Sequence, residues 1–241
     1  DGASSDGAGS DAGLHWYRYH HLFAEVLRTY LDKAYPNLAP DLHRRASAWF
    51  EQNDLPAEAI RHALAAKDFD RAADLIEQVW LGMDVTYQSA AWLAWAKVLP
   101  MDRIRARPVL SVGYGWALLG IGEIEASEAY LRDAETWLEP VENPAENFPT
   151  KMVVVDEAEF RSLPASIAAA RAYRALALGD IDRTKMHARK ALALISEGEN
   201  LHRTQATALL GMAEYASGNL HAAEQEFLKF QAMMWQANDI A

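Results

Sequence analysis

One short pattern occurs four times along the chain, each time between segments of helical periodicity. Every copy begins with a turn residue, continues with a capping-type or acidic residue, and has an apolar residue third and a small residue sixth. The copies begin at Lys67, Gly122, Gly179 and Gly218. Glycine can end a helix in a left-handed conformation, and the polar residue after it can start the next helix. The small residue lets two helices approach closely, so the pattern predicts successive helical hairpins.

The stretch from Leu42 to Val79 shows the helices that lead into the first copy. Its apolar residues recur at helical spacing in three successive runs. Pro56 suits the first turn of the second helix because its missing N–H would be unpaired there anyway, and Asn53 or Asp54 can cap that helix. Later helical segments are 166–178, 181–195, 203–217 and 220–230. We therefore expect an all-α fold, a right-handed tetratricopeptide-like superhelix of helical hairpins, that is, an α-α solenoid.

The composition suits such an array and excludes several classes of site. The chain has 241 residues, of which 51% are hydrophobic, and it contains no cysteine, so a disulfide framework or a thiolate site is ruled out. No apolar run reaches transmembrane length and no secretory signal pattern begins the chain, so a cytoplasmic location without a membrane partner is expected. The formal net charge of −11 disfavours binding of nucleic acid by this chain itself.

Three blocks carry a resemblance to a known family: WYRYHHLFAEVLRTYL at 16–31, LHRRAS with EAIRHAL within 42–64, and RARPVLSVGYGWALLGIGEIEASEAYLRDAE at 105–135. They resemble the large ATP-dependent LuxR-type transcription activators of the STAND class, whose type member activates the maltose regulon. The resemblance extends from about Leu14 to the end of the chain. It implies a parent with a signal-transduction ATPase, a winged-helix segment, a repeat array that senses inducer, and a DNA-binding helix-turn-helix.

Fitted to this chain, the resemblance implies three parts. Residues 1–13 hold only small and acidic residues and are expected to form a flexible linker; residues 14–37 would be a winged-helix remnant, a strand followed by a helix over 21–35. Residues 38–241 would form the repeat domain, with a loop insertion at 139–164. At the end, Asn238 and Asp239 stand where another helical pair would begin, so the chain is expected to be cut from a longer array.

Five aromatic residues are the candidate ligand-binding residues. They share a setting in nearly uncharged segments with helical spacing: Tyr87, Trp92, Trp95, Tyr114 and Trp116. One interpretation is an aromatic surface on which a sugar ring or another flat ligand stacks. The other is repeat core, because aromatic residues at helical spacing usually bury themselves. Gly113 and Gly115 destabilise a helix and make sense only where something packs closely.

Two other groups of polar residues lack the spacing of a functional site. His15, His20 and His21 lack the helical ligand spacing and the neighbouring carboxylate of a metal site, so polar and aromatic packing is favoured and no metal is predicted. The carboxylates of the 139–164 insertion lack the spacing of a calcium loop and a partner for general acid–base catalysis, so a solvated acidic loop is expected.

The expected function is regulatory rather than catalytic. The sequence contains no GxxxxGK[ST] phosphate loop and no basic helix-turn-helix after the repeats, so no catalytic residue and no cofactor are predicted here. ATP and DNA would bind to parts of the parent outside this chain. The resemblance implies that a small-molecule inducer bound in the superhelix shifts the parent between a resting state and an ATP-bound, self-associating state. The alternative is a protein-interaction scaffold that takes a peptide or a regulatory protein in its groove.

Overall fold

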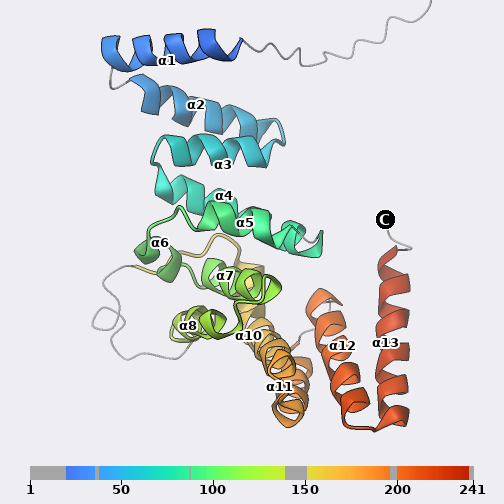
Figure 1. Cartoon of the computed structure of the whole chain (residues 1–241). Helices are drawn as coiled ribbons and strands as arrows, with labels where there is room; N and C mark the ends of the chain where they lie inside the picture. Colours follow the sequence, from blue (N-terminus) through green and yellow to red (C-terminus); the bar gives the residue numbers. More distant parts are fainter. Residues whose placement is uncertain (1–19, 36–37, 87, 139–150, 196–199, 239–241) are drawn as a thin grey trace, which may run out of the picture.

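The chain folds into a curved stack of helices (Figure 1). The computed structural model describes residues 20–35, 38–86, 88–138, 151–195 and 200–238, and within these ranges it contains helices and no strand. The expected all-α, tetratricopeptide-like array of hairpins is confirmed. The predicted linker at 1–13, the predicted strand up to residue 19 and the part of the insertion at 139–150 lie outside the described residues.

Apart from the long segment between α8 and α10, the helices follow one another with short connections. In chain order they are α1 (His21–Ala34), α2 (Leu38–Gln52), α3 (Pro56–Ala65), α4 (Phe69–Val85), α5 (Ser89–Ala96), α6 (Met101–Arg105), α7 (Pro108–Gly120), α8 (Ile124–Glu135), α10 (Glu157–Ala177), α11 (Ile181–Leu194), α12 (Asn200–Ala216) and α13 (Leu220–Asn238). Hairpins form from α2 and α3, α7 and α8, α10 and α11, and α12 and α13. Figure 1 shows a stack from α1 to α8 that then bends, so that α12 and α13 stand beside it.

The four recurring corners have the geometry that the sequence pattern predicts. Their first residues adopt positive φ angles, +56° at Lys67, +84° at Gly122, +76° at Gly179 and +78° at Gly218. In each corner the next residue donates its N–H back to the preceding helix, for example from Asp180 to the carbonyl of Ala175 at 2.9 Å. These bonds satisfy carbonyl groups that a helix end would otherwise leave unpaired.

The remaining positions of the corner pattern are confirmed in part, since Glu123 makes no side-chain capping hydrogen bond at the start of α8. The small sixth residues are all buried: Ala72, Ser127, Thr184 and Ala223. The carboxylates of Asp68 and Asp180 accept backbone N–H groups at the starts of α4 and α11. The apolar third residue of the last corner, Leu220, remains exposed instead of filling a corner.

Several predicted boundaries are wrong. α3 is preceded by Leu55 rather than capped by Asn53 or Asp54, because Asp54 takes a φ of +56° and closes α2. α10 begins at Glu157, so the last eight residues of the predicted 139–164 insertion are helical and Pro164 lies inside the helix. The carboxylate of Asp156 starts α10 by accepting two backbone N–H groups. α13 continues to Asn238, so this residue belongs to α13, and Asp239 lies outside the described residues.

Two close approaches explain the glycines of α7. A Cβ on Gly113 would lie 3.0 Å from the Trp80 ring, and a Cβ on Gly115 would lie 3.0 Å from the Leu131 side chain. The expected close packing at these positions is therefore confirmed. Farther along the array, buried alanines of α10, α11 and α12 make the core. Small side chains of this kind let neighbouring helices approach closely.

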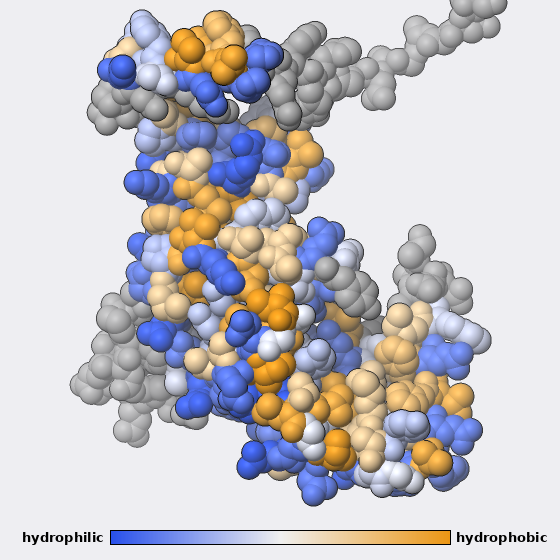
Figure 2. All heavy atoms as spheres, in the orientation of Figure 1, coloured by the Kyte–Doolittle hydropathy of each residue, from blue (hydrophilic) through white to orange (hydrophobic). Residues whose placement is uncertain are grey.

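Helix α1 exposes several apolar side chains. Its apolar residues Leu22, Val26 and Tyr30 are more than half exposed, and Figure 2 shows apolar residues gathered on this end of the array. None of the helices in the described part of the chain is long and apolar enough to span a lipid bilayer.

Candidate functional site

Trp92, one of the five predicted aromatic residues, lies in the core. Its side chain is fully buried, and its indole N–H donates to the carbonyl oxygen of Ile76 at 2.8 Å. The ring meets Trp80 in a T-shaped contact with centroids 4.7 Å apart. A buried indole whose donor is satisfied gains nothing further from a polar ligand. Trp92 therefore belongs to the core, where it packs against Trp80 and Tyr114.

Tyr114 and Trp95 also pack into the first core cluster. Tyr114 is 6% exposed, and its ring stacks on Tyr130 with centroids 4.3 Å apart. Burial, and secondarily the neighbouring Tyr130, raise the pKa of Tyr114 to about 12. Trp95 is partly buried against the same cluster. Tyr87 lies outside the described residues.

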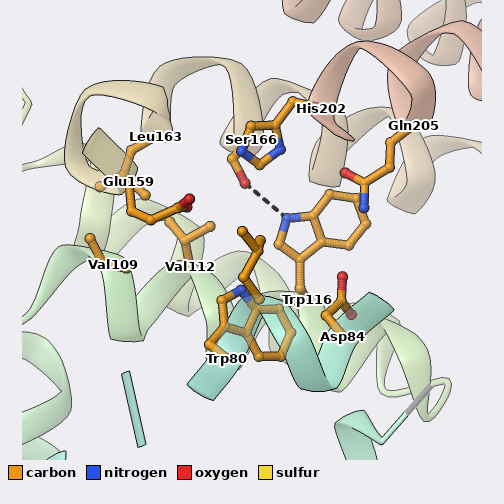
Figure 3. Close-up of a pocket in the computed structure, with 11 residues that line it drawn as sticks. Trp80, Asp84, Val109, Val112, Trp116, Glu159, Leu163, Ser166, His202 and Gln205 are labelled. Atoms are coloured by element: carbon orange, nitrogen blue, oxygen red, sulfur yellow. Dashed lines mark hydrogen bonds between the residues drawn. The ribbon is translucent and has the colours of Figure 1, made fainter. Parts of the chain in front are cut away.

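Trp116 is the predicted aromatic residue that lines a pocket (Figure 3). We call this hollow the Trp116 pocket. Its walls come from four helices, α4, α7, α10 and α12: Trp80, Leu81, Asp84, Val109, Val112, Trp116, Glu159, Leu163, Ser166, His202 and Gln205. The Trp116 indole N–H donates to the Ser166 hydroxyl at 3.1 Å, which fixes the ring between α7 and α10.

The curvature of the array brings these walls together. α7 packs against α4, and α10 packs against both α7 and α12. The last turns of α4 supply Asp84, and the first turns of α12 supply His202 and Gln205. The pocket therefore joins helices that are far apart in the sequence through a chain of neighbouring contacts.

Two residues of the Trp116 pocket carry buried polar atoms without hydrogen-bond partners. His202 is 8% exposed, and its Nδ1 atom is buried with no hydrogen-bond partner. The Oε1 atom of Gln205 is also buried and unpaired. Leaving a buried polar atom unpaired costs about 1–3 kcal/mol, so such atoms need an explanation. The cavity volume of about 10 Å³ admits one water-sized group.

Asp84 brings a carboxylate to the same pocket. It accepts a hydrogen bond from the Ser89 hydroxyl at 3.2 Å. Burial raises the pKa of Asp84, whereas the Ser89 hydrogen bond and the neighbouring His202 oppose that rise. The carboxyl group of Glu159 lies on the wall opposite Trp116 (Figure 3).

Comparison with known proteins gives relatives over most of the chain. The HTH-type transcriptional regulator MalT of Serratia proteamaculans is 28% identical over 208 residues, which is 86% of this chain and 22% of that protein. MalT of Yersinia pestis is 27% identical over 213 residues, 88% of this chain and 22% of that protein. The chain is a homologue of MalT.

A second kind of relative matches a shorter stretch. The serine/threonine-protein kinase PknK of Mycobacterium tuberculosis is 35% identical over 129 residues, 54% of this chain and 12% of the kinase. The chain thus spans less than a quarter of the length of MalT and about an eighth of PknK. No family model and no solved structure matches the chain.

Most residues of the Trp116 pocket were not predicted from the sequence. Trp80, Ser166, His202 and Gln205 lie in four separate helical segments with no shared spacing. The available signals were weak: Gly113 indicated that a large side chain packs on α7, and that side chain is Trp80. Similarity to MalT does not identify the pocket residues either.

A separate buried ion cluster lies where α6 meets α7, and we call it the Arg107 cluster. The Arg107 side chain is 4% exposed; its Nη1 lies 2.7 Å from Asp74 Oδ1 and 3.6 Å from Glu77 Oε2. The other Glu77 oxygen accepts the N–H of Val155 at 3.3 Å. Burial raises the pKa of Glu77 to about 7, although Arg107 lowers it. The cluster holds segment 151–155 against α4.

A backbone contact also ties segment 151–155 to the repeats, since Val153 N–H donates to the Ala106 carbonyl at 2.9 Å. Metal ligands are a different matter. Among the described residues, no group of three or more His, Cys, Asp or Glu side chains could hold a metal ion. The rings of His20 and His21 contact each other at a tilt of 37°, with centroids 4.3 Å apart, and His15 lies outside the described residues.

Proposed function

We propose that this chain is the regulatory repeat region of an ATP-dependent, LuxR-type transcription regulator, and that it binds a small-molecule effector in the Trp116 pocket. Its homology to proteins named HTH-type transcriptional regulator MalT supports the regulatory part of the proposal. ATP and DNA would bind to other parts of the parent protein. The proposed location is cytoplasmic.

The observation that carries the ligand-binding part is the pair of buried, unpaired atoms at the pocket, His202 Nδ1 and Gln205 Oε1. A polar ligand group would satisfy them. Among the five predicted aromatic residues, Trp116 would contact the ligand directly. Trp92 would support the pocket by packing on Trp80, and Tyr114 would contribute to the core beneath it.

The proposed mechanism follows from where the pocket lies. A ligand shifts a conformational equilibrium only by as much as its affinities for the two states differ. A group held between α4 and α12 would favour the curvature at which both helices line the pocket. The parent would thereby shift from a resting state toward an ATP-bound, self-associating state.

Thermal unfolding of the chain against sugars, amino acids, nucleotides, aromatic acids and amines tests the proposal. A ligand at 100 times its dissociation constant adds about 2.7 kcal/mol of stability. The stabilisation should saturate and should shrink in Gln205→Met. It should persist in Gln231→Met, a matched change on the exposed side of α13. If no chemical class stabilises the chain, or if Gln205→Met leaves the effect intact, the proposed site is wrong.

The second candidate function is a protein-interaction scaffold, which the exposed apolar residues of α1 favour. Sedimentation velocity of the chain and of the double variant Leu22→Asp, Val26→Asp addresses it. Association that depends on concentration and is lost in the variant would support an interaction surface on α1. A monomer at all concentrations, together with a saturating ligand effect, would leave the sensor function as the better explanation.

A further inference from the structure

Two histidine side chains meet inside the first hairpin of the array. His43 of α2 and His62 of α3 place their Nδ1 atoms 2.8 Å apart. Both residues are partly buried, and their rings lie with centroids 5.0 Å apart at an angle of 40°. They belong to the LHRRAS and EAIRHAL blocks of the sequence, and neither of them lines the Trp116 pocket. The proposed function therefore leaves this contact unexplained.

A distance of 2.8 Å between two imidazole nitrogens requires a proton between them. One Nδ1 must donate and the other must accept, because two lone pairs or two N–H groups would repel each other at this distance. The neutral pair meets this condition, and so does the pair with one added proton, in which an imidazolium donates to a neutral ring. A second added proton puts a hydrogen on both Nδ1 atoms and a positive charge on both rings, so the contact must open.

The surroundings of His62 oppose its protonation. Burial lowers the pKa of His62, and the positive charges of Arg61 and of a protonated His43 lower it further. Glu58 of the same helix raises that pKa, but its effect is smaller. The ring of Phe50 stacks on His62 with centroids 5.2 Å apart, which restricts rotation of the imidazole. Further charged groups on the neighbouring helices pair with one another or are exposed: Glu25 and Lys33 of α1, Arg44 and Glu51 of α2, and Asp68 and Arg71 of α4.

The position of the pair links it to α1. The second half of α2 has its own attachment, because the Arg71 guanidinium of α4 donates to the Ser47 hydroxyl at 2.9 Å and to the Glu51 carboxylate. Arginine keeps its charge in proteins, so acid does not remove the donor of this attachment. When the contact between His43 and His62 opens, α2 therefore stays attached through its second half and loses a contact in its first half. α1 packs against α2 at the top of Figure 1, so its position depends on that contact.

We propose that His43 and His62 form a proton-controlled contact, the histidine latch, that fixes α1 and the first half of α2 on the array until both rings are protonated. The two protonation steps belong to the pair rather than to either ring. Histidine is the side chain whose charge ordinarily changes between about pH 5 and 8. Because the pKa of His62 is lowered, its stabilisation of the hairpin is complete above the unfolded value of about 6.5 and is lost as pH falls through the folded value.

Two measurements on the whole chain test the histidine latch. Histidine ¹H–¹³C spectra recorded against pH should show two steps for the pair, separated by about one pH unit or more. Spin labels then report the distance from α1 to the array, since the chain contains no cysteine and Glu25→Cys with Lys97→Cys places one label on α1 and one after α5. Double electron–electron resonance should give a narrow distance distribution above both steps and a broader one below the second step. Circular dichroism should show the same helicity in both states.

His43→Asn is the decisive variant, because an amide can donate or accept near the position of Nδ1 by turning about its last bond. The new amide can therefore pair with His62 in either protonation state. The label distance should stay narrow at both pH values, and His62 should titrate in one step, about one pH unit or more above the second step of the unaltered pair. His62→Asn is the second variant, in case His43→Asn does not fold. His221→Asn is the matched control on α13, where the side chain is 81% exposed, and it should change neither the two steps nor the broadening.

Three results would overturn the inference. The first is a single titration step shared by His43 and His62. The second is a label distance that stays the same below the second step, or that broadens equally in both asparagine variants. The third is a second step that occurs only together with loss of helicity, because the pair would then be a contact of the folded state and no control of α1.

Discussion

Replacing Arg107 with methionine tests the account of the Arg107 cluster. Arg107 is the cation nearest to the buried carboxyl group of Glu77, and Met retains much of its apolar length. Breaking a buried ion pair by removing one partner costs about 3–5 kcal/mol when the other charge stays buried. The side chain of Asp74, the second partner of Arg107, is 45% exposed, so the loss of this ion pair adds at most about 1 kcal/mol to the destabilisation.

The cost of Arg107→Met should depend on pH, because Glu77 can avoid a buried charge by binding a proton. In the native chain the pKa of Glu77 is raised from 4.5 to about 7. A raised pKa contributes stability that is complete below the unfolded value and is lost as pH rises through the folded value. Without Arg107 the pKa of Glu77 in the folded chain rises further, so the stability of the variant continues to fall as pH rises above 7. The variant should therefore be destabilised more at pH 9 than at pH 6, by up to about 1.4 kcal/mol per unit of additional pKa rise.

Urea unfolding followed by circular dichroism at both pH values measures this difference. Arg103→Met is the matched control: Arg103 pairs with Asp70 at 2.8 Å, but the two side chains are 43% and 64% exposed. That change should cost no more than about 1 kcal/mol and should cost the same at pH 6 and pH 9. The reasoning is refuted if Arg107→Met costs no more than the control, or if its cost is independent of pH.

Two further predictions concern packing and a buried carboxylate. Gly211→Ala should destabilise the chain by about 1–3 kcal/mol, because its Cβ would lie 2.8 Å from the Phe227 ring; Gly82→Ala, with nothing within 4 Å, should stabilise it by about 0.5–1 kcal/mol. Urea unfolding should show a lower free energy of unfolding for Gly211→Ala and a higher one for Gly82→Ala. Changes of the same sign in the two variants would contradict the packing argument. Glu214 is buried, and the hydrogen bond from Lys185 lowers the pKa of its carboxyl group. The stabilisation of the fold by the ionised carboxylate is therefore present above the pKa of Glu214 in the unfolded chain and is lost as pH falls through its pKa in the folded chain. Glu214→Gln should therefore cost about 1.5–3 kcal/mol at pH 7 and less at pH 3 in thermal unfolding, and an equal cost at both would refute the role of the charge.

The fold could be predicted from the sequence because its determinants are local. A left-handed turn residue, a capping carboxylate and a small residue act within six positions, as at Gly179, Asp180 and Thr184. The misplaced boundaries have local causes as well. Asp54 resembles a capping residue, yet it takes the left-handed conformation that ends α2. Pro164 resembles the end of a loop, yet α10 runs through it.

The candidate site could not be predicted in this way because its residues meet through the curvature of the array. Each hairpin contacts its neighbours, and small rotations between hairpins add up along a solenoid. The first turns of α12 come close to the end of α4 because these rotations accumulate along the array. No spacing of residues in the sequence indicates this accumulated rotation. Trp116 was predicted for its residue type, whereas His202 and Gln205 carry no such signal.

The Trp116 pocket differs from the aromatic core around Trp92 because it holds buried polar atoms that lack hydrogen-bond partners. The aromatic residues of the two regions are equally evident in the sequence. Trp92 is larger and more deeply buried than any polar residue of the pocket, but its one donor is satisfied within the protein. His202 and Gln205 each bury an atom that lacks a partner, at a cost of about 1–3 kcal/mol per atom. Such a cost at a contact between distant helices is recovered when a ligand supplies the missing donors. Ligand binding would then also stabilise the curvature that forms the site, which is the coupling that a regulatory repeat array requires.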